Sequence, residues 1–295
     1  MLRTIKDENL MDVFNDPSEI VRIVENYRNS GFKIGLVPTM GALHAGHLSL
    51  IKAARAECDK VIVSIYVNPT QFGENEDLNK YPRPFKRDLE LCNAEGADMI
   101  MHLNDSDMYP ANYRTYVNVE YLTETLCGAS RPHHFRGVTT IVAKLLNLSK
   151  PHFAYFGQKD AQQAIVIKRM AADLNFDVTI KVCPIVREDD GLAMSSRNVF
   201  LSEKHRKQAV VLQQALQKAL LLYNAGEKNS QILIDSVSET IINECSGRID
   251  YAELVSTENL HPISEVNEKA LLAVAVFFDE TRLIDNQLLP GDATI

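Results

Sequence analysis

The sequence predicts an α/β protein in which a parallel sheet is followed by a smaller α+β domain. Apolar runs of strand length alternate with helical patterns from about residue 20 to residue 183. The runs 34–37, 61–67 and 153–156 are almost continuously apolar, as expected of strands that are covered on both faces. Because such alternation builds βαβ units, we expect a Rossmann-like first domain.

The expected elements follow from apolar periodicity and from proline and glycine signals. In the first domain, helices are expected over residues 17–30, 48–57, 83–95, 138–148 and 160–174. Strands are expected over residues 33–37, 61–67, 97–102, 115–119, 153–156 and 178–182.

A change in composition near Pro184 marks the domain boundary. We therefore expect residues 1–186 to form the first domain and residues 187–295 to form the smaller one. The smaller domain is expected to contain helices and paired strands, over residues 202–224 and 229–245 and over residues 249–255 and 270–278. The tail 289–295 is expected to be disordered.

Composition excludes several classes of protein. With 45% hydrophobic and 24% charged residues, the chain of 295 residues is typical of globular proteins. A formal net charge of -8 argues against a broad nucleic-acid surface. The longest apolar run, Leu271–Phe278, is too short to span a bilayer, and the N-terminus lacks the apolar core of a signal peptide. We expect a cytoplasmic protein without nucleic-acid or membrane partners, and its five scattered cysteines make a zinc site improbable.

The segment Pro38–His47 is the strongest candidate for a functional site. It lies between a strand and a helix start, where free N–H groups and the helix dipole attract phosphate. Glycine at 41 and 46 would let a nucleotide approach the backbone closely. His44 and His47 could hydrogen bond to a reacting phosphoryl group. Taken alone, His-x-x-His also fits a metal pair or a helix surface.

Two other loops follow expected strands, where ligands bind in parallel sheets. Asn68 and Gln71 carry amides that suit a small substrate with hydroxyl and carboxylate groups, although Asn-Pro is also a turn signal. In the second loop, Lys159 can place a charge against phosphate, and Gln163 lies one turn further along the same helix. The alternative for this second loop is a plain helix start with Asp160 near its positive end.

Two polar segments are less specific. Residues 131–137 are locally basic, which fits either an anion site or a solvated loop. Ser195, Ser196 and Arg197 would make a phosphate clamp. The chain contains neither Gly-x-Gly-x-x-Gly after its first strand nor Gly-x-x-x-x-Gly-Lys-Ser/Thr, which argues against a dinucleotide-binding dehydrogenase and a P-loop ATPase.

Two motifs together resemble those of a known superfamily. His44-x-x-His47 and Met194–Arg197 resemble the His-Ile-Gly-His and Lys-Met-Ser-Lys-Ser signatures of nucleotidyltransferases, with Arg197 where lysine is usual. Longer strings resemble the pantothenate synthetase family in order and spacing, over about residues 17 to 285: Pro38–His47, Val67–Phe72, His134–Val138, Phe156–Asp160 and Met194–Asn198. That family joins pantoate to β-alanine through an enzyme-bound pantoyl adenylate and cleaves ATP to AMP and pyrophosphate.

The resemblance implies a role for each matching residue. The ATP site would comprise Met40, Gly41, Ala42, Leu43, His44, Ala45, Gly46, His47, Gly157, Gln158, Lys159, Asp160, Val186, Met194, Ser195, Ser196 and Arg197. Pantoate would be bound by Gln71 and Gln163, and β-alanine by Gln71. The implied catalytic groups are His47 (as proton donor), His44 and Lys159, with Mg²⁺ as cofactor and a homodimer as the assembly. Asp88 is a candidate metal ligand.

Two other functions remain open at this point. A nucleotidyltransferase that adenylates a phosphate would share His44 and His47, but it gives no reason for the loops around Gln71 and Lys159. A nucleotide-binding regulator without catalysis is disfavoured by the presence of His47, Lys159 and Arg197. The loop 187–198 is expected to act as a lid over the reactive adenylate, because an acyl adenylate hydrolyses readily in water.

Overall fold

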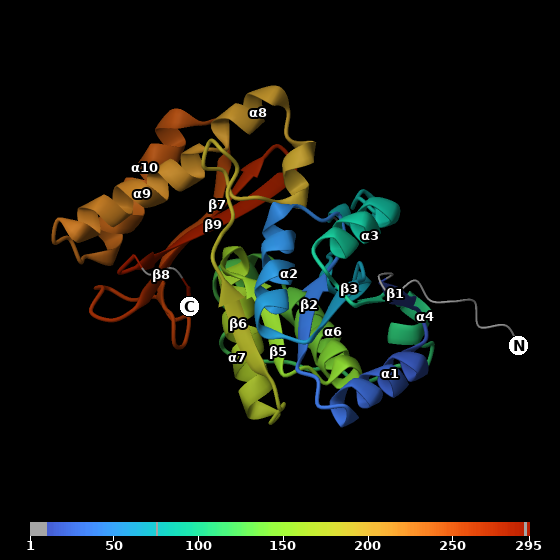
Figure 1. Ribbon diagram of the computed structural model, residues 1–295. Coiled ribbons are helices and arrows are strands. Elements are labelled where there is room, and N and C mark those ends of the chain that lie inside the picture. Colours follow the sequence, from blue (N-terminus) through green and yellow to red (C-terminus); the bar gives the residue numbers. More distant parts are fainter. Residues whose placement is uncertain (1–10, 75, 292–293) are drawn as a thin grey trace, which may run out of the picture. The chain divides into compact units, whose positions relative to one another are not determined.

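The structure is a computed structural model that describes residues 11–74, 76–291 and 294–295 (Figure 1). The chain forms two compact units. Unit 1 comprises the residues up to 118 together with 136–156 and 170–181, and unit 2 comprises 119–135, 157–169 and 182–295. The chain thus passes between the units several times, and the boundary predicted after residue 186 remains a prediction.

A six-stranded sheet with the order β1-β4-β3-β2-β5-β6 confirms the predicted Rossmann-like fold. In sequence order, its strands are β1 (Asp12–Phe14), β2 (Ile34–Thr39), β3 (Lys60–Ile65), β4 (Met99–Met101), β5 (Phe153–Gly157) and β6 (Thr179–Cys183). The longer helices between them are α1 (Pro17–Asn29), α2 (Ala45–Glu57), α3 (Phe85–Ala94), α6 (His134–Ser149) and α7 (Ala161–Asp173). Shorter helical turns are η1 (Pro69–Gln71), η2 (Asp77–Asn79), α4 (Asp105–Met108), α5 (Leu126–Ser130) and η3 (Gln158–Asp160).

The order of the strands reverses at β2. This strand pairs in parallel with β3 on one side and with β5 on the other. The chain therefore leaves β2 and β5 at the same edge of the sheet, and the two loops diverge there. Such a switch point is where open α/β sheets bind ligands. The two strands end at Thr39 and Gly157, directly before the predicted ATP-binding segments.

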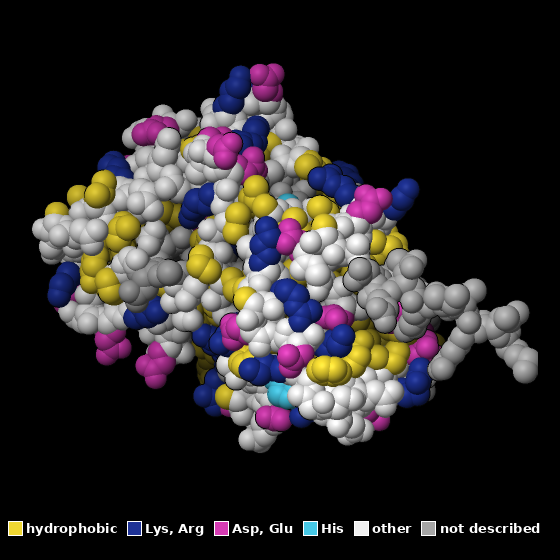
Figure 2. All heavy atoms as spheres, in the orientation of Figure 1, with side chains coloured by type: hydrophobic (Ala, Val, Ile, Leu, Met, Phe, Trp, Pro, Cys, Tyr) yellow, Lys and Arg dark blue, Asp and Glu magenta, His cyan; other side chains and the backbone are white. Residues whose placement is uncertain are grey.

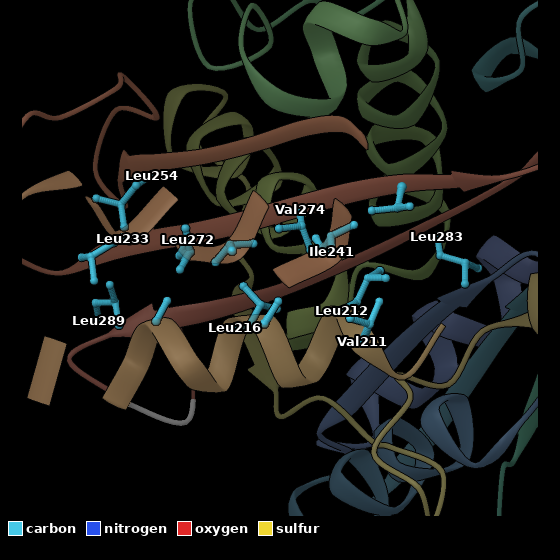
Figure 3. Packing of buried hydrophobic residues seen from close by; sticks show 14 of the residues in the cluster. Val211, Leu212, Leu216, Leu233, Ile241, Leu254, Leu272, Val274, Leu283 and Leu289 are labelled. Carbon is cyan, nitrogen blue, oxygen red and sulfur yellow. The ribbon is translucent and has the colours of Figure 1, made fainter. Parts of the chain in front are cut away.

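Unit 2 contains an antiparallel sheet of β7 (Arg248–Ser256), β8 (Ala270–Phe278) and β9 (Thr281–Leu289). The helices that follow β6 in this unit are η4 (Ser196–Phe200), α8 (Glu203–Gln208), α9 (Val211–Asn224) and α10 (Ser230–Glu244). In Figure 3, Leu212 and Leu216 of α9 point toward Leu272 and Val274 of β8, and all four are at most 1% exposed. Each such leucine contributes about 1.5–3 kcal/mol by leaving water, so this cluster holds the helices on the sheet.

Three sequence expectations were wrong, and one long strand was missed. The structure has no strand over 115–119; instead, Thr140 Oγ1 accepts from Val117 N (3.0 Å) and Thr139 Oγ1 donates to Val117 O (2.7 Å). The backbone at Val117 is therefore hydrogen-bonded to hydroxyl groups of α6 and not to a neighbouring strand. The helix expected over 202–224 is divided into α8 and α9, and β9 was not predicted. The tail is anchored rather than disordered, because Leu289 belongs to β9 and Ile295 N donates to Gln158 Oε1 (3.0 Å); residues 292–293 lie outside the described part.

Surface charge agrees with the composition. On the face seen in Figure 2, Lys and Arg side chains are interspersed with Asp and Glu, and the basic stripe typical of nucleic-acid binding is not seen there. None of the described helices is long and apolar enough to cross a membrane.

A buried ion pair connects β9 to the segment that follows β6. Asp285 is 2% exposed, and both of its carboxylate oxygens accept from the Arg187 guanidinium, at 2.6 and 3.0 Å. Breaking a buried pair by removing one partner is strongly destabilising, because the other charge is left uncompensated.

We expect Asp285→Ala to lower the free energy of unfolding by about 3–5 kcal/mol in urea denaturation. Asp279→Asn is the matched control, because Asp279 pairs with His205 at 3.1 Å while its side chain is 80% exposed, and asparagine tolerates the positive φ of 51° at this position. Such an exposed pair contributes at most about 1 kcal/mol. Equal losses in the two variants would contradict the role given to the buried pair.

Candidate active site

The two histidines of the Pro38–His47 segment begin α2. His44 is the N-cap, and its Nδ1 accepts from Gly46 N at 3.2 Å. In return, His47 Nδ1 accepts from His44 N at 3.4 Å, a long but reciprocal contact. This is a capping box in which imidazoles replace the usual hydroxyl and carboxylate groups. The two histidines therefore cap α2 and lie at its N-terminal end.

The capping box also determines what the rings can donate. Because Nδ1 of each ring accepts a backbone hydrogen, a neutral imidazole here carries its own proton on Nε2. The ring centroids of His44 and His47 lie 4.1 Å apart, and both residues are half-buried. Two adjacent Nε2–H donors at a helix N-terminus are suited to stabilising a phosphoryl group that carries negative charge.

Asp88 fixes the loop that precedes these histidines. Its carboxylate on α3 is 1% exposed and accepts from Ala42 N (2.9 Å) and from Leu43 N (2.8 Å). The loop needs such an anchor because Gly41 and Ala42 have positive φ angles of 80° and 51°. A side chain at Gly41 would also place its Cβ 3.0 Å from Asp88 Oδ2, a tight contact that adds to the strain of the positive φ angle.

These contacts limit how the loop can bind a phosphate. The amides of Gly41, Ala42 and Leu43 donate to Thr39 or Asp88, and the Gly46 amide donates to His44. The Ala45 amide, in contrast, belongs to the first residue of α2 and therefore has no acceptor within the helix. Phosphate recognition by this loop is therefore expected to use the Ala45 amide and the two imidazoles.

Gln71 is oriented by a buried network. Its Oε1 accepts from Asn68 Nδ2 (3.0 Å), and its Nε2 lies 3.0 Å from Met40 Sδ, a weak acceptor. Asn68 is 1% exposed, and its Oδ1 accepts from Tyr109 OH at 2.8 Å. Burial raises the pKa of Tyr109 to about 12, so this hydroxyl remains a donor at neutral pH. The network leaves Gln71 presenting an amide N–H₂ group, which suits a carboxylate or hydroxyl acceptor.

The segment 131–137 contributes a close backbone contact. A Cβ on Gly137 would lie 2.4 Å from Thr70 O and 2.7 Å from Gln71 N, so only glycine fits. Gly137 O also accepts from Asn68 Nδ2 at 3.2 Å. The Arg136 guanidinium stacks over the Tyr116 ring, 3.9 Å from its centroid. Within this segment, Gly137 therefore supports the loop that carries Gln71.

A cavity of about 600 Å³ in unit 1 adjoins this loop. Met40, Gly41 and Asp88 line one side of it. The opposite side is formed by residues that follow β3 and β4, among them Tyr66 and His102. Open space therefore lies beyond the carboxyl ends of these strands, next to the histidine loop.

In unit 2, the predicted phosphate-binding lysine follows β5. Lys159 lies in η3, and its Nζ is 3.8 Å from Asp160 Oδ2, a long ion pair with a half-exposed partner. Gln158 is 3% exposed, and the carbonyls of Gln158 and Lys159 both accept from Asn286 Nδ2 at 3.0 Å. Gln163 is half-buried on α7.

The Ser-Ser-Arg segment is also ordered by hydrogen bonds within unit 2. Met194 N donates to Val186 O (3.0 Å), which closes a short hairpin. Ser195 caps η4 by accepting from Arg197 N at 3.2 Å. Asn198 Nδ2 donates to Glu188 Oε1 at 2.7 Å. The predicted clamp therefore has a defined backbone.

The predicted site residues thus form two groups. Met40 to His47 and Gln71 lie together in unit 1, where Gln71 contacts Met40. Gly157 to Asp160, Gln163, Val186 and Met194 to Arg197 belong to unit 2. Sequence reasoning missed the roles of Tyr109 and Asn286, because their partners are 41 and 128 residues away and no local pattern marks them.

The predicted Mg²⁺ site has one candidate protein ligand, Asp88. Within the described residues, no group of three or more His, Cys, Asp or Glu is arranged to hold a metal. Mg²⁺ usually keeps several waters and is held by substrate phosphates plus one or two carboxylates. Both oxygens of Asp88 already accept amide hydrogens, so the metal role of Asp88 remains a prediction.

Comparison with known proteins identifies the family. A family model described as pantoate-beta-alanine ligase matches residues 12–288. The chain belongs to the pantoate–β-alanine ligase family, and it is a ligase. Pantothenate synthetase of Pelotomaculum thermopropionicum is 53% identical over 279 residues, covering 95% of this chain and 99% of the relative. That of Acetivibrio thermocellus is 52% identical, with the same coverage.

Solved structures of the family share the fold. The crystal structure of the Thermus thermophilus enzyme has a TM-score of 0.89 at 42% identity, covering 94% of this chain and 98% of that one. A pantoate-beta-alanine ligase from Francisella tularensis, complexed with beta-gamma ATP and beta-alanine, has a TM-score of 0.77 at 32% identity, covering 96% and 100%.

Asp88→Ala removes the acceptors of two amides in a buried loop. Each unpaired amide costs about 1–3 kcal/mol, so we expect a loss of about 2–6 kcal/mol in the free energy of unfolding. Hydrogen exchange at Ala42 and Leu43 should become faster, as measured by NMR. Glu90→Ala, at an exposed carboxylate of the same helix, is the control and should change neither quantity. Unchanged exchange at Ala42 and Leu43 would show that another group holds the loop.

Proposed function

We propose that the protein joins pantoate to β-alanine with cleavage of ATP to AMP and pyrophosphate, through a pantoyl adenylate. The observation that carries this proposal is the His44–His47 capping box beside the Gln71 network. The capping box supplies hydrogen-bond donors for a phosphate, and the Gln71 side chain beside it supplies an amide group suited to a hydroxy acid. The family match over residues 12–288 and the ATP and beta-alanine in the Francisella relative support it further.

In the first step, a pantoate carboxylate oxygen attacks the α-phosphorus of ATP. A P–O bond forms to pantoate while the bond to the β-phosphate oxygen breaks, and pyrophosphate leaves. Gln71 Nε2 and Gln163 would hold pantoate. The Nε2–H groups of His44 and His47 and the Ala45 amide would stabilise the charge on the transferring phosphoryl group.

In the second step, the free amine of β-alanine attacks the acyl carbon of the adenylate. The new C–N bond forms, the C–O bond to AMP breaks, and the amine loses one proton. Gln71 would also contact β-alanine. Among the described side chains we assign no general base, because the AMP phosphate can accept this proton and positioning supplies much of the rate.

Unit 2 would contribute the remaining ATP contacts. Lys159 would place its charge against the phosphates, with Gly157, Gln158 and Asp160 lining the nucleotide. Val186, Met194, Ser195, Ser196 and Arg197 would form the clamp, and the hairpin 187–198 would exclude water from the adenylate. Support comes from the sheet order, because β2 and β5 are parallel neighbours and end at one edge.

Further properties rest on the family resemblance alone. We propose that Mg²⁺ arrives with the ATP phosphates and neutralises part of their charge. A homodimer and a cytoplasmic location are proposed on the same basis. The domains would divide near residue 186, with the second acting as the lid.

The central test is exchange of labelled pyrophosphate into ATP. We expect exchange with pantoate and none with amino acids or nicotinamide mononucleotide. His47→Ala should slow single-turnover adenylation by about 10²–10⁴-fold, the range for a positioned proton-transfer group. The control is His261→Ala, at an exposed histidine of unit 2, which should react like the unmodified protein.

Other outcomes would favour other functions. Exchange with nicotinamide mononucleotide but not pantoate would indicate a phosphate-adenylating transferase. ATP binding without exchange for any substrate would indicate a regulator. Normal adenylation by His47→Ala would contradict the role given to that imidazole.

A further inference from the structure

Strand β9 carries two adjacent polar side chains that are both buried. Asp285 is 2% exposed and Asn286 is 5% exposed, although neighbouring side chains of a strand point to opposite faces. Buried polar groups are costly unless they are hydrogen-bonded. Asn286 is hydrogen-bonded to the turn that carries Lys159, and Asp285 to Arg187, which follows Val186.

Asn286 holds the turn that carries Lys159. Its Nδ2 donates to the carbonyls of Gln158 and Lys159, and its Oδ1 accepts from Gln158 Nε2; all three distances are 3.0 Å. Gln158 Oε1 in turn accepts from Ile295 N at 3.0 Å. Both ends of the Asn286 and Gln158 amides are therefore engaged, and a fully satisfied buried network of this kind is rigid.

Among the described residues, the one charged partner of the Lys159 ammonium group is Asp160, and the Lys159 side chain is 22% exposed. Its ion pair with Asp160 spans 3.8 Å, and the Asp160 side chain is 48% exposed, so this contact stabilises one orientation only weakly. The direction of the Lys159 side chain therefore depends on the backbone of η3. Asn286 is the side chain that fixes this backbone from outside the turn.

The neighbouring residue anchors the other segment. The Asp285 carboxylate binds Arg187, whose Nη1 also donates to Gly191 O at 3.1 Å. That hairpin leads directly into Ser195 and Arg197 of η4. Adjacent residues of one strand thus tie both ATP-binding segments of unit 2 to a single support.

We propose that Asn286 is a positioning residue that aims Lys159 at the phosphates of ATP. It acts through the carbonyls of Gln158 and Lys159 rather than by touching the nucleotide. The inference rests on the proposed function only in taking ATP as the ligand of Lys159. The proposal adds Asn286, which lies 128 positions from Gln158 in the chain, to the residues that determine the affinity for ATP.

The test is a double-mutant cycle read by ATP affinity, measured by isothermal titration without pantoate. Asn286→Ala should weaken ATP binding about 10–100-fold, the order of effect expected of a displaced positioning group. In a Lys159→Ala background, the same change should alter affinity less than about 3-fold, because residues that act as one unit are not additive. Thermal unfolding of each variant shows whether it is folded.

The matched control is Gln287→Ala. Gln287 is the next amide on β9, and its side chain contacts Gln217 and its own strand rather than η3. It should leave ATP affinity unchanged in both backgrounds. If Asn286→Ala does not fold, Asn286→Ser takes its place under the same criteria.

Three results would overturn the proposal. The first is an unchanged ATP affinity in Asn286→Ala. The second is that Asn286→Ala weakens ATP binding equally in the unmodified and the Lys159→Ala backgrounds. The third is that Gln287→Ala weakens ATP binding as much as Asn286→Ala does. Because the readout needs no pantoate, it is independent of the proposed reaction. Coupling between Asn286 and Lys159 in a protein that fails the exchange assay would contradict the proposed function and leave this inference standing.

Discussion

The carboxylate of Asp88 accepts the amide hydrogens of Ala42 and Leu43, and the loop of the candidate active site depends on these two contacts. Without them, a turn with two consecutive positive φ angles would lack its anchor and α2 would lack a fixed start. The histidine pair builds on that start, because each ring accepts a backbone hydrogen at the beginning of the helix through Nδ1. The buried carboxylate of Asp88 thereby holds the segment in which the imidazoles lie.

The same constraint, that buried polar groups must be paired, organises unit 2. There the paired groups are Asp285 with Arg187 and Asn286 with the turn around Lys159. Near Gln71, the pairs are Asn68 with Gln71 and Tyr109 with Asn68. Asn286 and Asn68 thus orient segments that carry predicted site residues, and Asp285 anchors the hairpin that leads to Ser195. In unit 2, the hydrophobic core of α9 and β8 also includes Leu283 and Leu289 of β9, the strand that carries Asp285 and Asn286.

The sequence was sufficient for the elements that follow simple periodicity. The apolar run before Thr39 and the Pro38–His47 segment predicted the β2–α2 unit, and the structure confirms it. Strand β9 was missed because Asp285, Asn286 and Gln287 interrupt its apolar pattern, and their burial depends on distant partners. The roles of Asp88 and Tyr109 in orienting the site were missed for the same reason: each acts on a segment about 40 residues away. A sequence pattern predicts which side chains bind, but tertiary pairing decides how they are held.

The central claim is that a carboxylate attacks the α-phosphorus of ATP and that an acyl adenylate forms. The most direct measurement uses pantoate labelled with ¹⁸O in its carboxylate, followed by mass spectrometry of the phosphate products. An adenylate leaves one carboxylate oxygen on phosphorus when the amine displaces AMP. The account therefore predicts ¹⁸O in AMP and none in pyrophosphate. Label in inorganic phosphate, or unlabelled AMP, would contradict it.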